Sequence, residues 1–581
     1  MKKNSFIKGL LFVLTMALLF VFAIQKQAKI WTFEPLNGVF EPTPQPELTF
    51  ETYRTAKFQS QVEPYLKENM GFREPLIRFY NQFLYDFFRK TYSEEVVIGK
   101  DHWFYFRQHV NEYYGTEMYR WFPSAEKARE GYDREARLMW KLRNILNEYG
   151  IEFLMFMAPD KGYLYPEHLP NRKMDTTSVN AREYYSRKFD EYGFPYIEMT
   201  KWFLDLKEAD TLPYSLFSQS GAHWGFSAVL AADSVFRLME DLKGVSLPKM
   251  HIGPLKESSI ETKHGDHDLE HTINLMRGVP HKYDRLYDAE VTVVADSTSM
   301  RPNVLFVGNS FLWRMHYYIP FDDMFSHSEY WFYNSTAYFG KGYSQSCMVG
   351  DLDLLSKLLE SDYVVWFTDG NQMYKVSYGF VESALMELCF SEEQVGERRE
   401  QLMDSLSRDS LTLRRFGSHL SKDELVSQLW TRANELMQKD PERYFPELAG
   451  DSVPTARNPR IPASLVIRDI KKDTAWMRNL QCQTVIRNAS LNQVLEMEAQ
   501  NVLNNRPLMR DSGEVFSPEV YVESLVKSMM EDMRYKPSLM EMIKEKADAN
   551  GWSVEEQLEA DARWIVNDQI NRGEIVLDTG E

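Results

Sequence analysis

Cysteine is scarce in this sequence of 581 residues, which has only Cys347, Cys389 and Cys482. Three cysteines allow at most one intramolecular disulfide, and their spacing matches no zinc-binding motif. Positive charge is also in deficit, because 85 Asp and Glu residues outnumber 67 Lys and Arg residues and give a formal net charge of −18. A general nucleic-acid surface needs clustered cations, so the composition argues against one. A chain that is 44% hydrophobic and nearly free of cross-links must depend on a large core.

Long apolar runs are equally rare, and one of them stands near the N-terminus. Residues 9–24 are apolar and follow Lys2, Lys3 and Lys8. The run is somewhat shorter than the roughly 20 residues that span a bilayer, and no clean small-residue cleavage site precedes Gln25. We therefore expect residues 1–30 to be a signal anchor in the bacterial inner membrane, with the bulk of the chain in the periplasm, or secreted if the signal is cleaved.

The length predicts two or three domains. Four prolines keep residues 31–54 extended and predict a linker. Residues 55–380 alternate between helical and apolar strand patterns, and residues 381–581 are charged, Met-rich and helical in texture. Within that last part, residues 473–503 and 536–566 align without a gap as a probable internal repeat of two amphipathic helices joined at a Ser cap. This pattern favours a helical packing or partner-docking module.

The middle part predicts an α/β domain. A helical pattern over residues 126–150 is followed by the apolar run "IEFLMFMAPDK", and similar runs end at residues 310 and 371. Apolar strands of this kind, alternating with helices, are typical of a parallel sheet covered on both faces. Ligands of such sheets bind at the carboxyl ends of the strands, so the polar residues that follow the runs are expected to form one site.

Two residues in this part have the chemistry of a nucleophile and its base. Ser310 follows a strand that ends in Gly308 and stands where a helix can begin, which would expose its hydroxyl beside backbone N–H groups. A serine needs a base, and His223 in "SGAHWG" is the best candidate because small residues precede it and Trp224 follows it. The alternative for each residue alone is a structural role in a turn.

The order of six short motifs resembles a known family. "GKDHWFYF", "MAPDKGYLYPEHLP", "SGAHWG", "DLEHTINL", "PNVLFVGNSF" and "DYVVWFTDGN" are similar in order to the SGNH-type acetyltransferase domain of the alginate O-acetyltransferase (AlgX/AlgJ-like) family, over residues 55–380. The resemblance implies a three-layer α/β/α fold and no cofactor. It also implies acetyl transfer to polysaccharide hydroxyls outside the cytoplasm, through an acetyl-serine on Ser310 with His223 as base. The acetyl donor would be a membrane-bound acyltransferase partner.

The sequence departs from the family pattern at two positions. Gly221 stands where an orienting Asp is usual two residues before the histidine, and Asn309 replaces the Asp of the serine motif. We expect Asp369, at a strand end, to supply the missing acid. The alternatives are a structural role of Asp369 in a turn and a serine–histidine dyad without an acid. The oxyanion donors are expected from the backbone at Gly308 and from a side chain, with Asn334 and Asn371 as the candidates. Further expected substrate contacts are Trp224 and Lys161.

A second cluster of polar residues has the side chains of a metal-binding site. The segment "KHGDHDLEH" contains three histidines and two aspartates, of which His267 and His271 would share a face at i and i+4 of a helix. Because the flanking "LEHTINL" resembles a family segment that needs no metal, we expect no metal at the active site. Two alternatives to transfer remain at this stage: an acetylesterase with the same serine and histidine, and a glycan-binding or assembly scaffold without activity.

Overall fold

The computed structural model describes residues 2–38, 43–258, 264–375, 378–409, 422–506, 508–509 and 516–575. All three cysteines are free thiols, and Cys389 and Cys482 are buried. Among the described residues, no helix combines the length and the apolar character that crossing a membrane requires.

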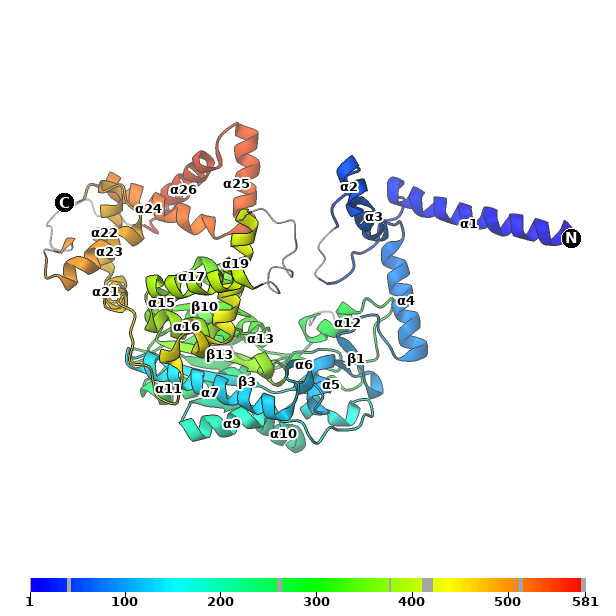
Figure 1. Ribbon diagram of the computed structural model, residues 1–581, viewed down its shortest axis with the longest axis horizontal. Coiled ribbons are helices and arrows are strands. Elements are labelled where there is room, and N and C mark those ends of the chain that lie inside the picture. Colours follow the sequence, from blue (N-terminus) through cyan, green and yellow to red (C-terminus); the bar gives the residue numbers. More distant parts are fainter. Residues whose placement is uncertain are drawn as a thin grey trace.

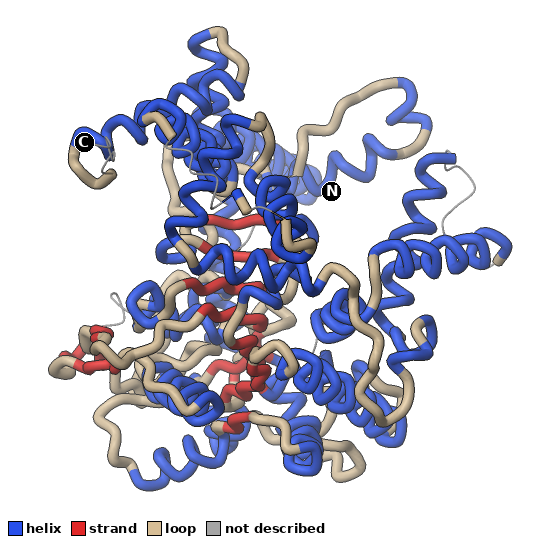
Figure 2. The backbone as a smooth tube through the Cα atoms, turned by 90° about the vertical axis from the view of Figure 1, so that its left-hand side faces the viewer, coloured by secondary structure: helices blue, strands red, loops and turns tan. Residues whose placement is uncertain are grey.

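A mixed sheet of seven strands forms the centre of the protein (Figure 2). The strand order is β12-β11-β10-β9-β13-β3-β4, with the five strands from β10 to β4 parallel and β11 and β12 antiparallel at one edge. The strands are β3 (Glu152–Ala158), β4 (Tyr196–Glu198), β9 (Asn303–Gly308), β10 (His327–Phe332), β11 (Thr336–Phe339), β12 (Gln345–Met348) and β13 (Tyr363–Asp369). The apolar runs of the sequence analysis are β3, β9 and β13, which lie side by side and are almost fully buried.

Helices cover both faces of this sheet. Two large hydrophobic clusters lie on its opposite sides. One is built with α10 (Thr200–Ala209), α11 (Ala228–Lys243), α13 (Phe311–Tyr318) and α14 (Phe321–Met324). The other is built with α7 (Ala125–Asn147), α9 (Ala181–Tyr192), α15 (Leu354–Glu360) and α16 (Phe380–Cys389). The predicted three-layer α/β/α class is therefore confirmed, with the correction that two edge strands make the sheet mixed.

Smaller elements lie outside the seven-stranded sheet. A hairpin is formed around "GKD", where β1 pairs antiparallel with β2. These elements are β1 (Val96–Ile98), β2 (Phe104–Phe106), α5 (Arg107–Tyr113), α6 (Met118–Trp121), α8 (Lys161–Leu164), β5 (Lys249–Ile252), β6 (Lys256–Glu257), α12 (Asp268–Thr272), β7 (Tyr287–Asp288) and β8 (Val291–Val294). Several of them carry residues of the candidate site.

The C-terminal part is helical, and its first helices pack into the main core. Met437, Phe445, Leu448 and Ile461 belong to the same hydrophobic cluster as strands β3 and β13. The domain boundary expected at residue 380 thus cuts through one continuous core. The helices are α17 (Glu392–Arg408), α19 (Lys422–Lys439), α20 (Pro441–Tyr444), α21 (Ile461–Lys472), α22 (Thr474–Ile486), α23 (Leu491–Leu503), α24 (Pro518–Arg534), α25 (Pro537–Asn550) and α26 (Val554–Asn571).

The two halves of the expected repeat each consist of a helix pair. Ser490 caps α23 and Ser553 caps α26, and each forms a capping box with the residue three positions later. The pairs differ in their surroundings, since α25 and α26 share a small core with α24, whereas α22 and α23 pack with α21.

The N-terminal part extends away from the sheet domain (Figure 1). It contains α1 (Lys2–Ala28), α2 (Phe50–Arg54), α3 (Lys57–Glu68) and α4 (Arg73–Phe88). The expected linker therefore ends in a short helix that begins at Phe50. Its earlier part is fixed to the domain at one point, where the Asn37 N–H donates to Asn274 Oδ1 at 2.7 Å.

Candidate active site

Ser310 stands at the carboxyl end of β9, where the chain enters α13. It is the N-cap residue of this helix, and its side chain is partly buried. Gly308 is required just before it because a Cβ at this position would lie 2.0 Å from the carbonyl oxygen of Phe367 in β13. Gly308 therefore permits the close approach of two parallel strands.

A hydrogen-bonded chain connects Ser310 to His223 and Asp268. His223 Nε2 lies 2.6 Å from Ser310 Oγ. On the other side of the ring, His223 Nδ1 is hydrogen-bonded to Asp268 Oδ2, and Asp268 Oδ1 accepts the Ala222 N–H at 2.7 Å. The serine and histidine that the sequence analysis paired therefore meet, and the acid beside the histidine is Asp268 and not Asp369.

Burial acts to raise the pKa of Asp268, but the adjacent His223 and the Ala222 N–H outweigh it and hold the pKa below its ordinary value. Asp268 is thus a carboxylate at neutral pH. A carboxylate at Nδ1 fixes the proton on that nitrogen and leaves Nε2 free to accept the hydroxyl proton of Ser310. The three side chains have the arrangement of a nucleophile, a base and an orienting acid.

Gly221 explains why the acid comes from a distant segment. A Cβ at Gly221 would lie 2.1 Å from the carbonyl oxygen of Asp266, because the chain around residue 266 passes directly over this glycine. Asp266 is itself held by an ion pair with Arg314 of α13. The family's acid position is therefore filled by backbone, and the same crossing segment delivers Asp268 to the histidine.

Asp369 has a different task from the one expected. Its Oδ1 accepts the Asn309 side-chain N–H at 2.8 Å, and its Oδ2 lies 3.5 Å from Nε2 of the buried His109. Burial opposes protonation of His109, but Asp160 and Asp369 raise the pKa of His109 above its ordinary value. Asn309 also receives the Phe311 N–H on its Oδ1. Asp369 and Asn309 thus stabilise the turn that carries Ser310.

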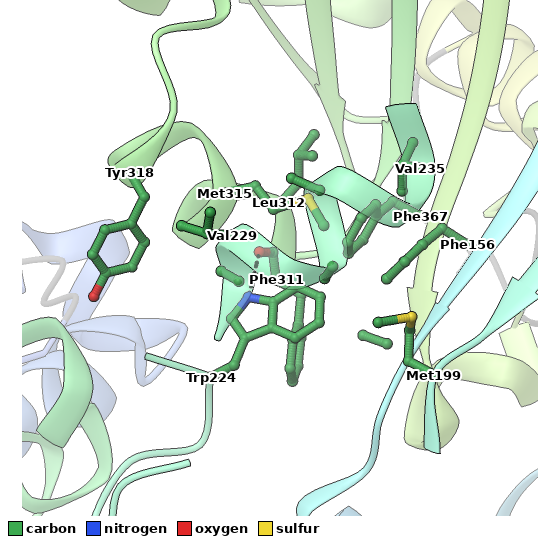
Figure 3. Packing of buried hydrophobic residues seen from close by; sticks show 14 of the residues in the cluster. Phe156, Met199, Trp224, Val229, Val235, Phe311, Leu312, Met315, Tyr318 and Phe367 are labelled. Carbon is green, nitrogen blue, oxygen red and sulfur yellow. Dashed lines mark hydrogen bonds between the residues drawn. The ribbon is translucent and has the colours of Figure 1, made fainter. Parts of the chain in front are cut away.

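Trp224 and Lys161 are buried and do not face a substrate. Trp224 is fully enclosed among aromatic and aliphatic side chains, and its indole N–H donates to the Phe311 carbonyl oxygen at 3.2 Å (Figure 3). The Lys161 ammonium donates to the carbonyl oxygens of Phe104, Gln219 and Gly221 at 2.7, 3.0 and 2.6 Å. Burial lowers the pKa of Lys161 to about 7. Both residues support the loop that holds His223, and their assignment as substrate contacts was wrong.

The oxyanion donors are placed differently from the expectation. Asn334 lies in the turn after β10, and its side-chain N–H donates to the Tyr378 carbonyl oxygen at 3.2 Å. The side chain of Asn371 lies outside the described part of the structure. The residue that reaches Ser310 is Tyr333, which the sequence analysis missed. Burial and Asp369 raise the pKa of Tyr333, while hydrogen bonds to the Ser310 side chain and backbone act in the opposite direction.

The His-rich segment braces the loop of His223. His267 and His271 do not share a helical face, because α12 begins only at Asp268, and the side chain of His264 is not described. In the described part of the chain, His267, His281 and Asp284 have ligand atoms within 4.8 Å of one another, as a metal site would require.

Hydrogen bonds occupy both ring nitrogens of His281 and the Nδ1 of His267 in this group. His281 lies 2.8 Å from Glu270 and 2.9 Å from Asp284. Burial opposes its protonation, but these two carboxylates raise the pKa of His281 to about 9. Ser220 joins His267 Nδ1 to Glu270. A protonated imidazole between two carboxylates fits a brace behind "SGAHWG" better than a metal ligand.

Comparison with known proteins identifies a family match in the middle of the chain. Residues 96–321 match the family described as ALGX, an SGNH hydrolase-like domain of the acetyltransferase AlgX. The O-acetyltransferase domain of Pseudomonas putida AlgJ is 13% identical, with a TM-score of 0.29, over 48% of this chain and 92% of that chain. Pseudomonas aeruginosa AlgX is 14% identical, with a TM-score of 0.30, over 48% of this chain and 67% of that chain. No curated protein sequence matches.

Residues 96–321 therefore form an SGNH hydrolase-like domain of the AlgX acetyltransferase type, and the resemblance drawn from the motifs is confirmed for this part of the chain. The matched range contains Ser310, His223 and Asp268, whereas Asp369 lies outside it. The matched domain supports O-acetyltransferase activity.

A buried carboxyl near the site makes the stability of the domain depend on pH. Burial raises the pKa of Glu112 in α5 from 4.5 to about 8, and the Tyr374 hydroxyl donates to it. The folded protein keeps this proton where the unfolded chain releases it. The contribution of Glu112 to stability is thus complete below its unfolded pKa of 4.5 and is lost as the pH rises through about 8.

We expect Glu112→Gln, whose amide cannot titrate, to remove part of the loss of stability that the wild type shows between about pH 5 and pH 8. Urea unfolding followed by tryptophan fluorescence at several pH values would measure the difference. If the free energy of unfolding of the wild type and of Glu112→Gln changed with pH in the same way over this range, Glu112 would be ionised in the folded protein.

Proposed function

We propose that this protein transfers acetyl groups to hydroxyls of a cell-surface or secreted polysaccharide, outside the cytoplasm, through an acetyl-serine at Ser310. The observation that carries the proposal is the chain Asp268–His223–Ser310, with 2.6 Å between His223 Nε2 and Ser310 Oγ. The AlgX-type domain over residues 96–321 supports the acetyltransferase class. The apolar N-terminal run behind three lysines supports export.

In the first half-reaction, the Ser310 Oγ attacks the acetyl carbonyl carbon of the donor while its proton passes to His223 Nε2. The carbonyl π electrons move to oxygen, and we assign the Ser310 N–H and the hydroxyl of Tyr333, which is hydrogen-bonded to Ser310, as the donors to this oxyanion. Collapse breaks the bond to the leaving group, which takes the proton from His223. Ser310 then carries the acetyl ester.

In the second half-reaction, a sugar hydroxyl gives its proton to His223 Nε2 as its oxygen attacks the acetyl-serine. Collapse of the second oxyanion breaks the bond to Ser310 Oγ, which recovers the proton. Asp268 stays ionised throughout and stabilises the imidazolium that forms in each half. A membrane-bound acyltransferase that presents its acetyl group outside the cytoplasm would be the donor, and no cofactor is needed.

The proposal is tested by trapping the intermediate. The full-length protein is incubated with a chromogenic acetyl ester, with and without an oligosaccharide acceptor, and digested for mass spectrometry. We expect one acetyl group on the peptide that contains Ser310, none in Ser310→Ala or His223→Ala, and faster loss of the adduct when the acceptor is present. An adduct that water removes as fast as the acceptor does would indicate an esterase. Glycan binding without any adduct would indicate a scaffold.

A further inference from the structure

Helix α4 is amphipathic, but its apolar face is exposed to solvent. Its apolar residues recur at helical spacing, which in a globular domain normally marks the face that packs on the core. In the structure these side chains point to solvent, with 62% of Phe79, 43% of Phe83 and 72% of Phe87 exposed. The other exposed apolar members of the face are Leu76, Tyr80 and Phe88. The set is named here the aromatic face of α4.

The face of α4 that rests on the domain contains two polar residues, Asn81 and Gln82, and one aromatic residue, Tyr85, all of them buried. The Asn81 side-chain N–H donates to the Ile273 carbonyl oxygen at 2.7 Å. Gln82 Oε1 accepts the Arg277 N–H at 3.0 Å. These contacts use specific hydrogen bonds and fix the orientation of the helix. The outward direction of the aromatic face is therefore built into the fold.

The charge of the N-terminal region differs in sign from that of the rest of the chain. Residues 1–92 contain 12 Lys and Arg residues and 8 Asp and Glu residues, for a net charge of +4. The whole chain carries −18, so the remaining residues carry −22. An anionic surface would attract the N-terminal region and repel the rest, which selects one orientation of the protein.

The aromatic face continues into other exposed apolar side chains of the same region. Trp31 and Phe33 are partly exposed and pack on Phe72, next to the start of α4, and Phe22 of α1 contacts the same ring. In Figure 1, α1 leaves the domain at this point and lies far from the C-terminal helices. Aromatic side chains mixed with Lys and Arg are the composition of protein segments at the bilayer interface.

From this exposure, the charge contrast and this continuity we infer that the aromatic face of α4 lies against an anionic lipid bilayer. Phe79, Phe83 and Phe87 enter the boundary between headgroups and acyl chains. The lysines and arginines of the region contact the headgroups. This contact is separate from any anchoring by α1, and it does not depend on the reaction that the domain catalyses.

A photocrosslinker within the aromatic face tests the inference. Benzoylphenylalanine replaces Phe83 in the full-length protein, and a matched variant carries it in place of Trp564 of α26, which is 68% exposed. Both proteins are mixed with vesicles of equal parts phosphatidylcholine and phosphatidylglycerol, irradiated and analysed by mass spectrometry. Since α1 is present in both, its own binding to vesicles does not distinguish them.

We expect lipid adducts at position 83 with about tenfold higher yield than at position 564, and a lower yield on vesicles of phosphatidylcholine alone. Unchanged thermal unfolding of both variants would show that the fold is retained. Equal lipid yields at the two positions would overturn the inference. So would adducts at position 83 that join two copies of the chain or join α4 to α1, because another occupant would then cover the face.

Discussion

Ser310→Ala is expected to lower kcat for acetyl transfer by about 10⁶-fold, the loss typical when the nucleophile of a serine triad is removed. The variant retains the fold because Ser310 is only partly buried and its hydroxyl bonds to His223 and Tyr333, not to a structural cap. The measurement is the initial rate of acetyl transfer to an oligosaccharide acceptor.

A matched control is Ser344→Ala, which removes an exposed serine in the turn before β12. This variant should keep the wild-type rate. If Ser310→Ala retained more than about a hundredth of the wild-type kcat, direct transfer from donor to acceptor would have to replace the covalent route.

Asp268→Asn is expected to lower kcat by about 10⁴-fold. The side-chain N–H of Asn can donate a hydrogen bond to His223 Nδ1 and so favour the imidazole tautomer with its proton on Nε2. That tautomer cannot accept the hydroxyl proton of Ser310. Asp268 acts through His223, so we regard it as a positioning residue, and the variant should raise KM little while kcat falls.

Asp369→Asn is the comparison that separates the two acids. It keeps an oxygen for the Asn309 side chain and leaves His223 with its carboxylate. We therefore expect a much smaller fall in kcat than for Asp268→Asn. Loss of activity in Asp369→Asn together with normal activity in Asp268→Asn would show that Asp369, and not Asp268, is the acid that orients His223.

The sequence was sufficient to find the nucleophile and the base because each has a local signature. Ser310 follows a buried strand that ends in glycine, and His223 stands in a segment of small residues. The acid has no such signature. Asp268 lies 45 residues from His223, and only the crossing of two loops at Gly221 brings it to the imidazole. The strand-end rule placed Asp369 at the correct edge of the sheet but could not tell which neighbour its side chain meets.

Burial was the other quantity that the sequence could not supply. The helical periodicity of residues 73–88 predicts a helix, and α4 is one, but periodicity does not determine which face turns inward. Lys161 shows the opposite error, because a lysine is rarely buried and this one was expected to contact a substrate. Three backbone carbonyl oxygens compensate its ammonium in the interior.

The residues that bind α4 and the acid of the active site, Asp268, belong to one short segment of the chain. Ile273 and Arg277, which bind Asn81 and Gln82 of α4, follow Asp268 closely, whereas Ser310 is fixed to a central strand of the sheet. Removal of α4 would therefore free the segment that follows Asp268 from two hydrogen-bond partners and leave the strand that precedes Ser310 untouched.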